Sequence, residues 1–323
     1  MNISIFVPHE GCPNQCSFCN QNAISGQYGR PSHDDIKKAA ETAVNTLGDR
    51  AKEAEIAFFG GSFTAIDRDY MTGLLQTAAE YIYNFKGIRI STRPDHIDGE
   101  ILSLLRRYSV TSIELGAQSL DDEVLNKNRR GHTAADVRSA SGLIKEHGFS
   151  LGLQMMTGLW GDTPEKSVYT AEEIIKLNPE TVRIYPAVTL KNTHLHNLYD
   201  SGKYLPMSLD ETVELCAELV EMFEQFGIRI IRLGLQAGDG VEKDYIAGPY
   251  HPAFGELVYG EIFFKRALSL LKSSGKRDII VNGGSLSKMR GHQNRNIKRF
   301  EDMGIAVRII GDDSLKPGEI AIK

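Results

Sequence analysis

The sequence predicts an α/β protein built on a parallel sheet, and two observations support this fold class. Six short apolar segments alternate with helical patterns over residues 1–185, an alternation typical of parallel α/β proteins. Each of these segments runs into glycine or polar residues at its carboxyl end, whereas the joins from helix to strand lack them. Parallel α/β folds place their chemistry at the carboxyl ends of the strands. The pattern therefore predicts a site at one edge of the sheet, although it decides only weakly between a barrel and an open sheet.

The expected strands are short and apolar, and they cover residues 3–7, 54–59, 87–91, 112–115, 150–156 and 181–185. Apolar residues at helical spacing predict the connecting helices, and Ser32 stands at an N-cap position ahead of the first of them. These helices cover residues 34–47, 69–85, 98–108, 121–126 and 133–147, and a further helix begins at Pro164.

Beyond residue 205 the alternation becomes looser. We assign residues 1–205 to the core and residues 206–323 to a C-terminal α/β extension packed on it. The elements expected in the extension are helices over 209–226 and 253–273 and strands over 228–233, 278–281 and 305–310. Cys216 lies on the apolar stripe of the first of these helices, which indicates core packing.

Composition excludes several classes of protein. Hydrophobic residues make up 41% of the 323 positions and charged residues 24%, as in ordinary globular proteins. No apolar run is long enough to span a bilayer, and no basic segment precedes the first apolar stretch, so we expect no membrane partner and no signal peptide. We therefore expect a cytoplasmic protein with reduced thiols. The net charge of −5 gives no overall attraction to nucleic acid, so such a partner would need a local basic patch.

Three of the four cysteines, Cys12, Cys16 and Cys19, lie within eight residues directly after the first expected strand. Three thiolates on one loop can hold a metal or a cluster and leave one coordination position open. A zinc site with His9 as the fourth ligand is the alternative. Zinc knuckles usually pair two Cys-x2-Cys units, and the chain contains no second unit.

The spacing Cys-x3-Cys-x2-Cys on a loop after a strand resembles the signature of radical S-adenosylmethionine (radical SAM) enzymes. The resemblance implies a partial (β/α)6 TIM-like barrel. It also implies a [4Fe–4S] cluster with three irons bound by the three cysteines and the fourth chelated by S-adenosylmethionine. One electron would cleave the sulfonium to methionine and a 5′-deoxyadenosyl radical, and a donor of the flavodoxin or ferredoxin type would supply that electron.

Further motifs resemble one branch of this family, which contains the catalytic subunit of Elongator. They are Phe59–Phe63, Ser91–Asp95, Glu114–Ser119 and Arg130–Thr133. The resemblance implies an S-adenosylmethionine pocket with the following members: Phe18 beside the adenine, Gly60 and Gly61 beside the methionine, and Ser91, Gln118, Arg130 and Gln154 as polar contacts. Arg130 would bind the methionine carboxylate. A solvated face is the alternative for Arg130, because other cations cluster around it.

The same branch implies tRNA as the substrate. We expect no acetyltransferase domain within these 323 residues, so the substrate does not transfer with the fold. A small metabolite, a tetrapyrrole, or a non-catalytic metal- or cluster-containing module that binds RNA are the alternatives. The run Lys288–Arg299 carries five positive charges and no acid. It is either a grip for RNA phosphates or a solvated helix face.

Overall fold

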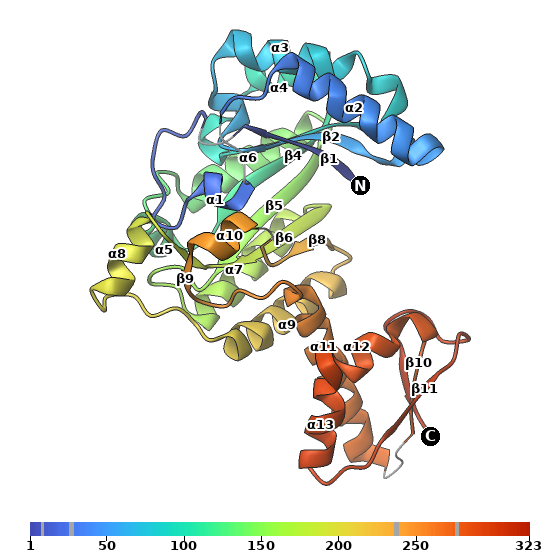
Figure 1. Cartoon of the computed structure of the whole chain (residues 1–323). Coiled ribbons are helices and arrows are strands. Elements are labelled where there is room, and N and C mark those ends of the chain that lie inside the picture. The colour runs from blue at the N-terminus through green and yellow to red at the C-terminus, as the bar shows by residue number, and fades with distance from the viewer. Residues whose placement is uncertain (8–9, 26–28, 236–238, 275–277) are drawn as a thin grey trace.

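Seven parallel strands form the main sheet in the order β1-β2-β3-β4-β5-β6-β8, and the sheet curls into a half-barrel (Figure 1). The structure is a computed structural model that describes residues 1–7, 10–25, 29–235, 239–274 and 278–323. The strands are β1 (Asn2–Val7), β2 (Glu55–Gly60), β3 (Gly87–Thr92), β4 (Val110–Gln118), β5 (Ser150–Thr157), β6 (Thr181–Pro186) and β8 (Arg229–Leu233). The predicted parallel α/β class and partial barrel are confirmed, with seven strands in the sheet where six were expected.

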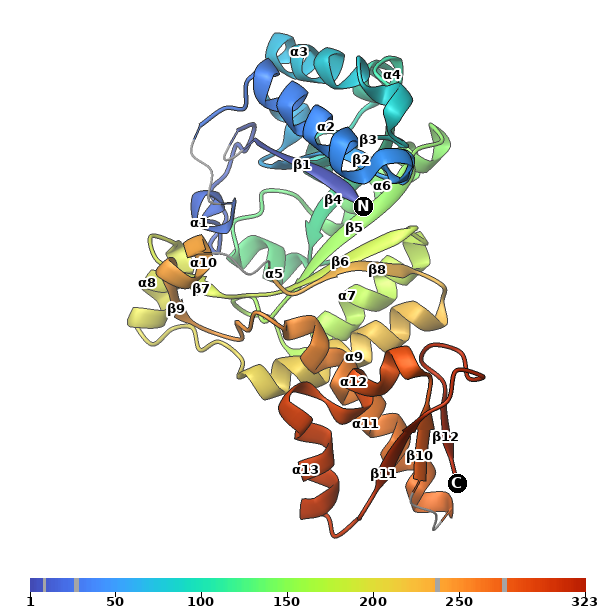
Figure 2. The ribbon, with the colours of Figure 1, turned by 45° about the vertical axis from the view of Figure 1, so that its right-hand side comes forward.

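Helices connect these strands, and most of them cover the outer face of the sheet (Figure 2). They are α2 (His33–Leu47), α3 (Arg68–Ala79), α4 (Gly99–Arg107), α5 (Asp122–Lys127), α6 (Ala134–Glu146) and α7 (Pro164–Leu177). Ser32 caps α2 as predicted, because its hydroxyl accepts from the amide of Asp35 and the Asp35 carboxylate accepts in return. The helix expected over 69–85 ends at Ala79, and a 3₁₀ helix over Ile82–Asn84 follows. Its aromatic and β-branched residues are weaker helix formers than those before them.

The two faces of the sheet differ in chemistry because successive residues of a strand point to opposite sides. Ile56, Phe58, Ile88 and Ile90 are buried in the main hydrophobic core, which also contains residues of α2, α3 and α4. Several of the alternate positions, which line the inside of the half-barrel, carry charged and polar side chains that bond to one another. A closed barrel would fill this space with branched aliphatic residues.

The chain beyond residue 205 contributes to the main core. Strand β8 pairs with β6, and α9 (Leu209–Gln225) packs with the first part of α11 (Phe254–Ser274) in the same core. Cys216 is fully buried there, which confirms its predicted packing role. The boundary between residues 205 and 206 stays a prediction.

A second, smaller core lies at the C-terminal end (Figure 2). It is built by the second half of α11 and a three-stranded sheet in the order β11-β10-β12. The elements here are β10 (Asp278–Val281), β11 (Arg308–Gly311), β12 (Ile320–Ile322), α12 (Leu286–Arg290) and α13 (Arg295–Asp302). The strand expected over 305–310 begins three residues later, and β12 was not predicted.

Several short elements gather at the carboxyl edge of the main sheet (Figure 1). They are α1 (Gln21–Ser25), α8 (His194–Asp200), α10 (Asp239–Asp244), β7 (Thr189–Leu190) and β9 (Tyr245–Ala247). The remaining 3₁₀ helices cover Gly48–Glu53, Phe63–Ala65, Pro94–His96, Gly283–Ser285 and His292–Asn294. Within the described ranges, no helix combines the length and apolar character needed to cross a membrane.

Candidate site at the cysteine loop

The cysteine loop, residues 10–20, follows β1 and folds against the carboxyl end of β2. The amide of Gly61 donates to the carbonyl of Val7 over 2.9 Å, and the amide of Ser62 donates to the carbonyl of Glu10 over 2.9 Å. Gly11 has a φ of +69°, and a Cβ there would lie 2.2 Å from the carbonyl oxygen of Ser62. Glycine is therefore required for the loop to lie this close to β2.

Gly60 and Gly61, the two glycines predicted beside the cofactor, border the same loop. A Cβ on Gly61 would lie 1.9 Å from the carbonyl oxygen of Glu10, and one on Gly60 would lie 2.5 Å from that of Val7. A larger residue at Gly61 would push the cysteine loop away, and one at Gly60 would push away the end of β1 from which the loop leaves. The close approach of two backbones explains both glycines, and their contact with the cofactor stays a prediction.

Ser17, in the middle of the cysteine motif, fastens the other side of the loop. Its amide donates to the carbonyl of Asn128 over 3.1 Å, and its hydroxyl donates to Oδ1 of Asn128 over 2.5 Å. Its carbonyl accepts from the amide of Leu195 over 2.7 Å. The Asn128 amide group in turn donates to the carbonyls of Val124 and Trp160. Neither Ser17 nor Asn128 was singled out in the sequence.

The side chain of Arg130 reaches the cysteines. Nη1 donates to Sγ of Cys16 over 3.0 Å, and Nη2 donates to the carbonyl of Gly116 over 2.6 Å. A tight turn brings it there, since Arg129 has a φ of +55° and Gly131 a φ of +71°. Arg130 is only 6% exposed, so it is not part of a solvated face.

Arg93 is a second buried guanidinium beside this loop, and it was not assigned from the sequence although it lies in a quoted motif. Nε and Nη2 donate to the two carboxylate oxygens of Asp95 over 2.9 and 2.7 Å. A Cβ at Gly131 would lie 2.0 Å from Nδ2 of Asn14 and 3.4 Å from Nη2 of Arg93. The guanidinium of Arg93 therefore adjoins both the cysteine loop and the turn that carries Arg130.

Four side chains in this neighbourhood bury a polar atom for which the described residues offer no hydrogen-bond partner. The atoms are Nη1 of Arg93, Oε1 of Gln118, Nε of Arg130 and Nδ1 of His132. Each such group destabilises a fold by about 1–3 kcal/mol. Gln118 also has a φ of +66°, a conformation that is strained for a residue other than glycine and that concentrates at functional sites. Unpartnered buried polar atoms of this kind are expected where a polar ligand binds.

The thiols lie in a poorly solvated environment. Burial raises the pKa of Cys12, and burial together with the neighbouring thiols raises the pKa of Cys19 to about 12, while Arg130 acts in the opposite direction on both. The metal-free thiols of Cys12 and Cys19 are therefore protonated at neutral pH, and a bound cluster must displace their protons.

The thiols and guanidinium groups of this site fit an iron–sulfur cluster that carries a ligand with a carboxylate group, such as the methionine part of S-adenosylmethionine. Thiolates are the usual ligands of such clusters, and guanidinium groups match a carboxylate. In the part of the chain that the structure covers, no three His, Cys, Asp or Glu side chains converge on one metal ion. In a cluster, each thiolate binds a separate iron, so convergence on one point is not needed. His9, the fourth ligand of the zinc alternative, lies outside the described residues.

Phe18 packs into the edge of the half-barrel. It contacts two small apolar clusters, formed by Val124, Leu159 and Ala187 and by Leu195, Leu198 and Tyr204. Trp160 packs against the second cluster and its ring meets that of His194 edge-on at 6.3 Å. The adenine contact of Phe18 stays a prediction.

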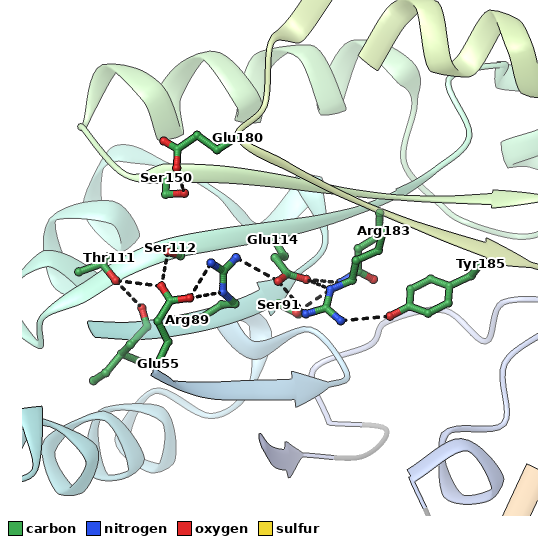
Figure 3. Close-up of polar contacts among 12 residues, drawn as sticks. Glu55, Arg89, Ser91, Thr111, Ser112, Glu114, Ser150, Glu180, Arg183 and Tyr185 are labelled. Carbon is green, nitrogen blue, oxygen red and sulfur yellow. Dashed lines mark hydrogen bonds and ion pairs between the residues drawn. The ribbon is translucent and has the colours of Figure 1, made fainter. Parts of the chain in front are cut away.

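Ser91 lies inside the half-barrel in a polar network (Figure 3), and Gln154 belongs to the same network through its hydrogen bonds. Nε2 of Gln154 donates to Oε2 of Glu114 over 3.0 Å and to the hydroxyl of Ser91 over 3.4 Å. Arg89 and Arg183 bind the same carboxylate of Glu114 from either side. The sequence signal for this network is a charged or polar side chain at alternate positions of otherwise apolar strands.

The basic run 288–299 is largely engaged within the C-terminal part. Arg295 pairs with Asp210 over 2.8 Å, Arg299 pairs with Glu261, and Nζ of Lys288 lies 4.6 Å from the ring centre of Tyr259. Three of its five cations therefore have partners in the fold.

The chain is similar to known proteins over most of its length. A model of the radical SAM superfamily matches residues 6–174, more than half of the chain, and a model of the radical SAM C-terminal domain matches residues 179–263. A tRNA uridine(34) acetyltransferase from Dehalococcoides mccartyi is 23% identical over 266 residues, which are 72% of this chain and 58% of that protein. Elongator complex protein 3 from Dictyostelium discoideum is 29% identical over 202 residues, 55% of this chain and 36% of that protein.

Among solved structures, the archaeal Methanocaldococcus infernus Elp3 has a similar fold, with a TM-score of 0.68 and 20% identity over 83% of this chain and 63% of that one. The chain spans about half the length of the curated relatives it matches. The matched family uses a [4Fe–4S] cluster and S-adenosylmethionine, the two cofactors that the cysteine motif predicts. From its family match, its fold and its cysteine loop, this chain belongs to the radical SAM superfamily of enzymes.

Proposed function

We propose that this protein binds a [4Fe–4S] cluster through Cys12, Cys16 and Cys19 and acts as a radical SAM enzyme in tRNA modification. When bound, the cluster supplies one electron that cleaves S-adenosylmethionine to methionine and a 5′-deoxyadenosyl radical. The observation that carries the proposal is the contact of the buried Arg130 guanidinium with Cys16, beside polar atoms that lack partners among the described residues.

The chain's own residues have distinct roles in this proposal. Arg93 and Arg130 place two positive charges beside the thiolates and offset their negative charge. Nη1 of Arg93 and Nε of Arg130 remain as donors for the carboxylate of S-adenosylmethionine, a charge-assisted contact. Oε1 of Gln118 remains as an acceptor for its amino group or a ribose hydroxyl.

The proposal of tRNA as the substrate has two supports. The names of several relatives state an activity on tRNA uridine. In addition, the edge that carries the cysteine loop presents an exposed Arg129, whose Nη2 lies 3.2 Å from Nε2 of His194, with Trp160 against the same ring. Cations beside aromatic rings suit RNA, because bases stack on the rings and phosphates attract the cations. The run 288–299 suits this role less, since most of its cations are paired.

We also propose an electron donor for the cluster and a cytoplasmic location for the protein. A donor of the flavodoxin or ferredoxin type would reduce the cluster. A cytoplasmic location would keep the three thiols reduced until the cluster is assembled.

The test uses anaerobically reconstituted protein with dithionite, S-adenosylmethionine and total tRNA, followed by assays for 5′-deoxyadenosine and modified nucleosides. We expect 5′-deoxyadenosine and a changed uridine nucleoside. Formation of 5′-deoxyadenosine with unchanged tRNA would indicate that the substrate is a metabolite or a tetrapyrrole instead of tRNA. A protein that binds RNA and releases no 5′-deoxyadenosine would support the non-catalytic module instead.

A further inference from the structure

A continuous network of charged groups crosses the inside of the half-barrel from β2 to β6 (Figure 3). Glu55 pairs with Arg89 over 2.6 Å, and Arg89 pairs with Glu114 over 3.0 Å. Glu114 then pairs with Arg183 over 2.6 Å. Two carboxylates and two guanidiniums alternate, so the network carries no net charge.

The two ends of this network differ. At the Glu55 end, one carboxylate oxygen accepts from Arg89 and the other accepts from the hydroxyl of Ser112 over 2.6 Å, so both oxygens are used. At the other end, the side chain of Arg183 is 12% exposed against 1% for Glu114, and Tyr185 and Gln154 are half-buried. The network is therefore closed at Glu55 and open at Arg183.

Glu114 fixes the direction of the hydrogen bonds at the open end. An ionised carboxylate only accepts, so it binds Nε and Nη2 of Arg183 and Nε2 of Gln154 as donors. The amide of Gln154 is thereby oriented with its oxygen left as an acceptor. Nη1 of Arg183 donates to the oxygen of Tyr185 over 3.4 Å, which leaves the Tyr185 hydrogen and the second Nη1 hydrogen as donors.

The open end lies next to the cysteine loop. In the pairing of β5 with β6, Gln154 stands opposite Arg183, and Met156 stands opposite Tyr185. Met156 and Phe18 of the cysteine loop pack against the same apolar cluster. A ligand bound at the open end would therefore be close to the site of the chemistry.

Fold stability alone does not account for this network. Buried ion pairs are often no more stabilising than apolar residues of similar size. Aromatic rings lie beside this end of the network, because the guanidinium of Arg183 stacks over the Phe59 ring at 4.9 Å and the Phe6 ring lies 6.1 Å from that of Phe59. Oriented polar groups beside aromatic rings are the features that bind a nucleobase.

We propose that Gln154, Arg183 and Tyr185 bind the hydrogen-bonding edge of a pyrimidine base of the RNA substrate, and that Glu114 is their positioning residue. In this proposal Gln154 contacts the base instead of S-adenosylmethionine, the ligand that the sequence resemblance implies for it. This inference rests on the proposed function. The three side chains offer two donors and one acceptor, which complement the two acceptors and one donor of a pyrimidine edge. Guanine has the inverse set, with one acceptor and two donors, and does not complement these three groups.

The test measures the affinity of the reconstituted full chain for RNA hairpins that differ only in one unpaired loop base, by anaerobic fluorescence anisotropy. The loop base is uridine, N3-methyluridine, which lacks the donor, or guanosine. We expect the uridine hairpin to bind most tightly. Tyr185→Phe should weaken the uridine hairpin about two- to tenfold, the effect of one neutral hydrogen bond, and leave the guanosine hairpin unchanged.

Glu114→Gln should abolish the preference for uridine, measured as the ratio of the affinities for the uridine and guanosine hairpins. A purely structural role of Glu114 would leave this ratio unchanged. Ser112→Ala is the matched control, because it removes a hydrogen bond at the closed end of the same network. Thermal melting identifies any variant that fails to fold. If Glu114→Gln fails to fold, the test rests on Tyr185→Phe, which loses only one hydroxyl group. Equal binding of the three hairpins, or an equal loss of preference in Ser112→Ala, would overturn this inference and leave the tRNA proposal standing. No binding of any hairpin by a protein that forms 5′-deoxyadenosine would overturn both.

Discussion

The guanidinium of Arg130 lies 3.0 Å from the sulfur of Cys16, although 114 positions separate the two residues in the chain. The turn after α5 therefore closes over the cysteine loop and places a permanent positive charge on the motif that is proposed to hold the cluster. The same guanidinium retains a buried Nε without a partner among the described residues. These two properties make Arg130 both a neighbour of the thiolates and a candidate ligand of the cofactor carboxylate.

Arg130→Ala should lower the affinity for S-adenosylmethionine about ten- to hundredfold, because hydrogen bonds to charged groups contribute about 1.5–3 kcal/mol. Iron content should stay at the wild-type level, since the cysteines remain. Anaerobic equilibrium dialysis with labelled S-adenosylmethionine measures the change, and Arg129→Ala is the control. Unchanged affinity in Arg130→Ala would remove this residue from the cofactor site.

Gly61→Ala should destabilise the protein by about 1–3 kcal/mol and lower its iron content, because the new methyl group would lie 1.9 Å from the carbonyl oxygen of Glu10. Gly142→Ala is the matched control, since it lies in α6 with no atom within 4 Å of the added Cβ. The control should be neutral or slightly stabilising. Thermal melting and iron analysis of both variants check the prediction, and equal behaviour would refute it.

The double variant Arg129→Ala with His194→Ala removes the cation and the ring at the carboxyl edge of the sheet. It should weaken tRNA binding about three- to tenfold, as expected for lost phosphate and stacking contacts. The matched control is Arg290→Ala with Lys298→Ala, two exposed cations of the run 288–299. Filter binding at two salt concentrations measures both pairs. A larger loss in the control pair would assign the RNA contact to the C-terminal run instead.

The stability of the iron-free protein should fall between about pH 6.5 and pH 4 through His132. Burial, followed by the charges of Arg130 and Arg93, lowers the pKa of His132 to about 4, against 6.5 for the ordinary group. In this interval the unfolded chain binds a proton that the folded chain does not, so stability decreases as the pH falls. Urea unfolding at pH 7.5 and pH 5 should show a loss about 2 kcal/mol larger in wild type than in His132→Gln. Equal losses would contradict the burial of a neutral His132.

The sequence was informative where a feature is local. The strand pattern, the cap at Ser32 and the position of the cysteine loop all depend on neighbours within a few residues, and the structure agrees with each. Strand β8 was predicted as a strand, but its place in the main sheet was not, because pairing with β6 joins segments on either side of α9.

Residues whose role depends on distant partners could not be predicted. Asn128 matters because it binds Ser17, which is 111 positions away, and Glu114 matters because it joins side chains from three other strands. The short helices α1 and α10 also escaped prediction. Helices of five or six residues are not stable alone and form here through packing, since a Cβ at Gly240 would lie 2.3 Å from the carbonyl oxygen of Ala23.

The central claim is that the three thiolates of the cysteine loop hold a [4Fe–4S] cluster. Its most direct test is the iron content and the EPR spectrum of dithionite-reduced protein after anaerobic reconstitution, for wild type, Cys16→Ala and Cys216→Ala. We predict about four irons per chain and a reduced-cluster signal in wild type and in Cys216→Ala, and loss of both in Cys16→Ala. Wild-type iron content and signal in Cys16→Ala, or a colourless wild-type protein without iron, would contradict the account.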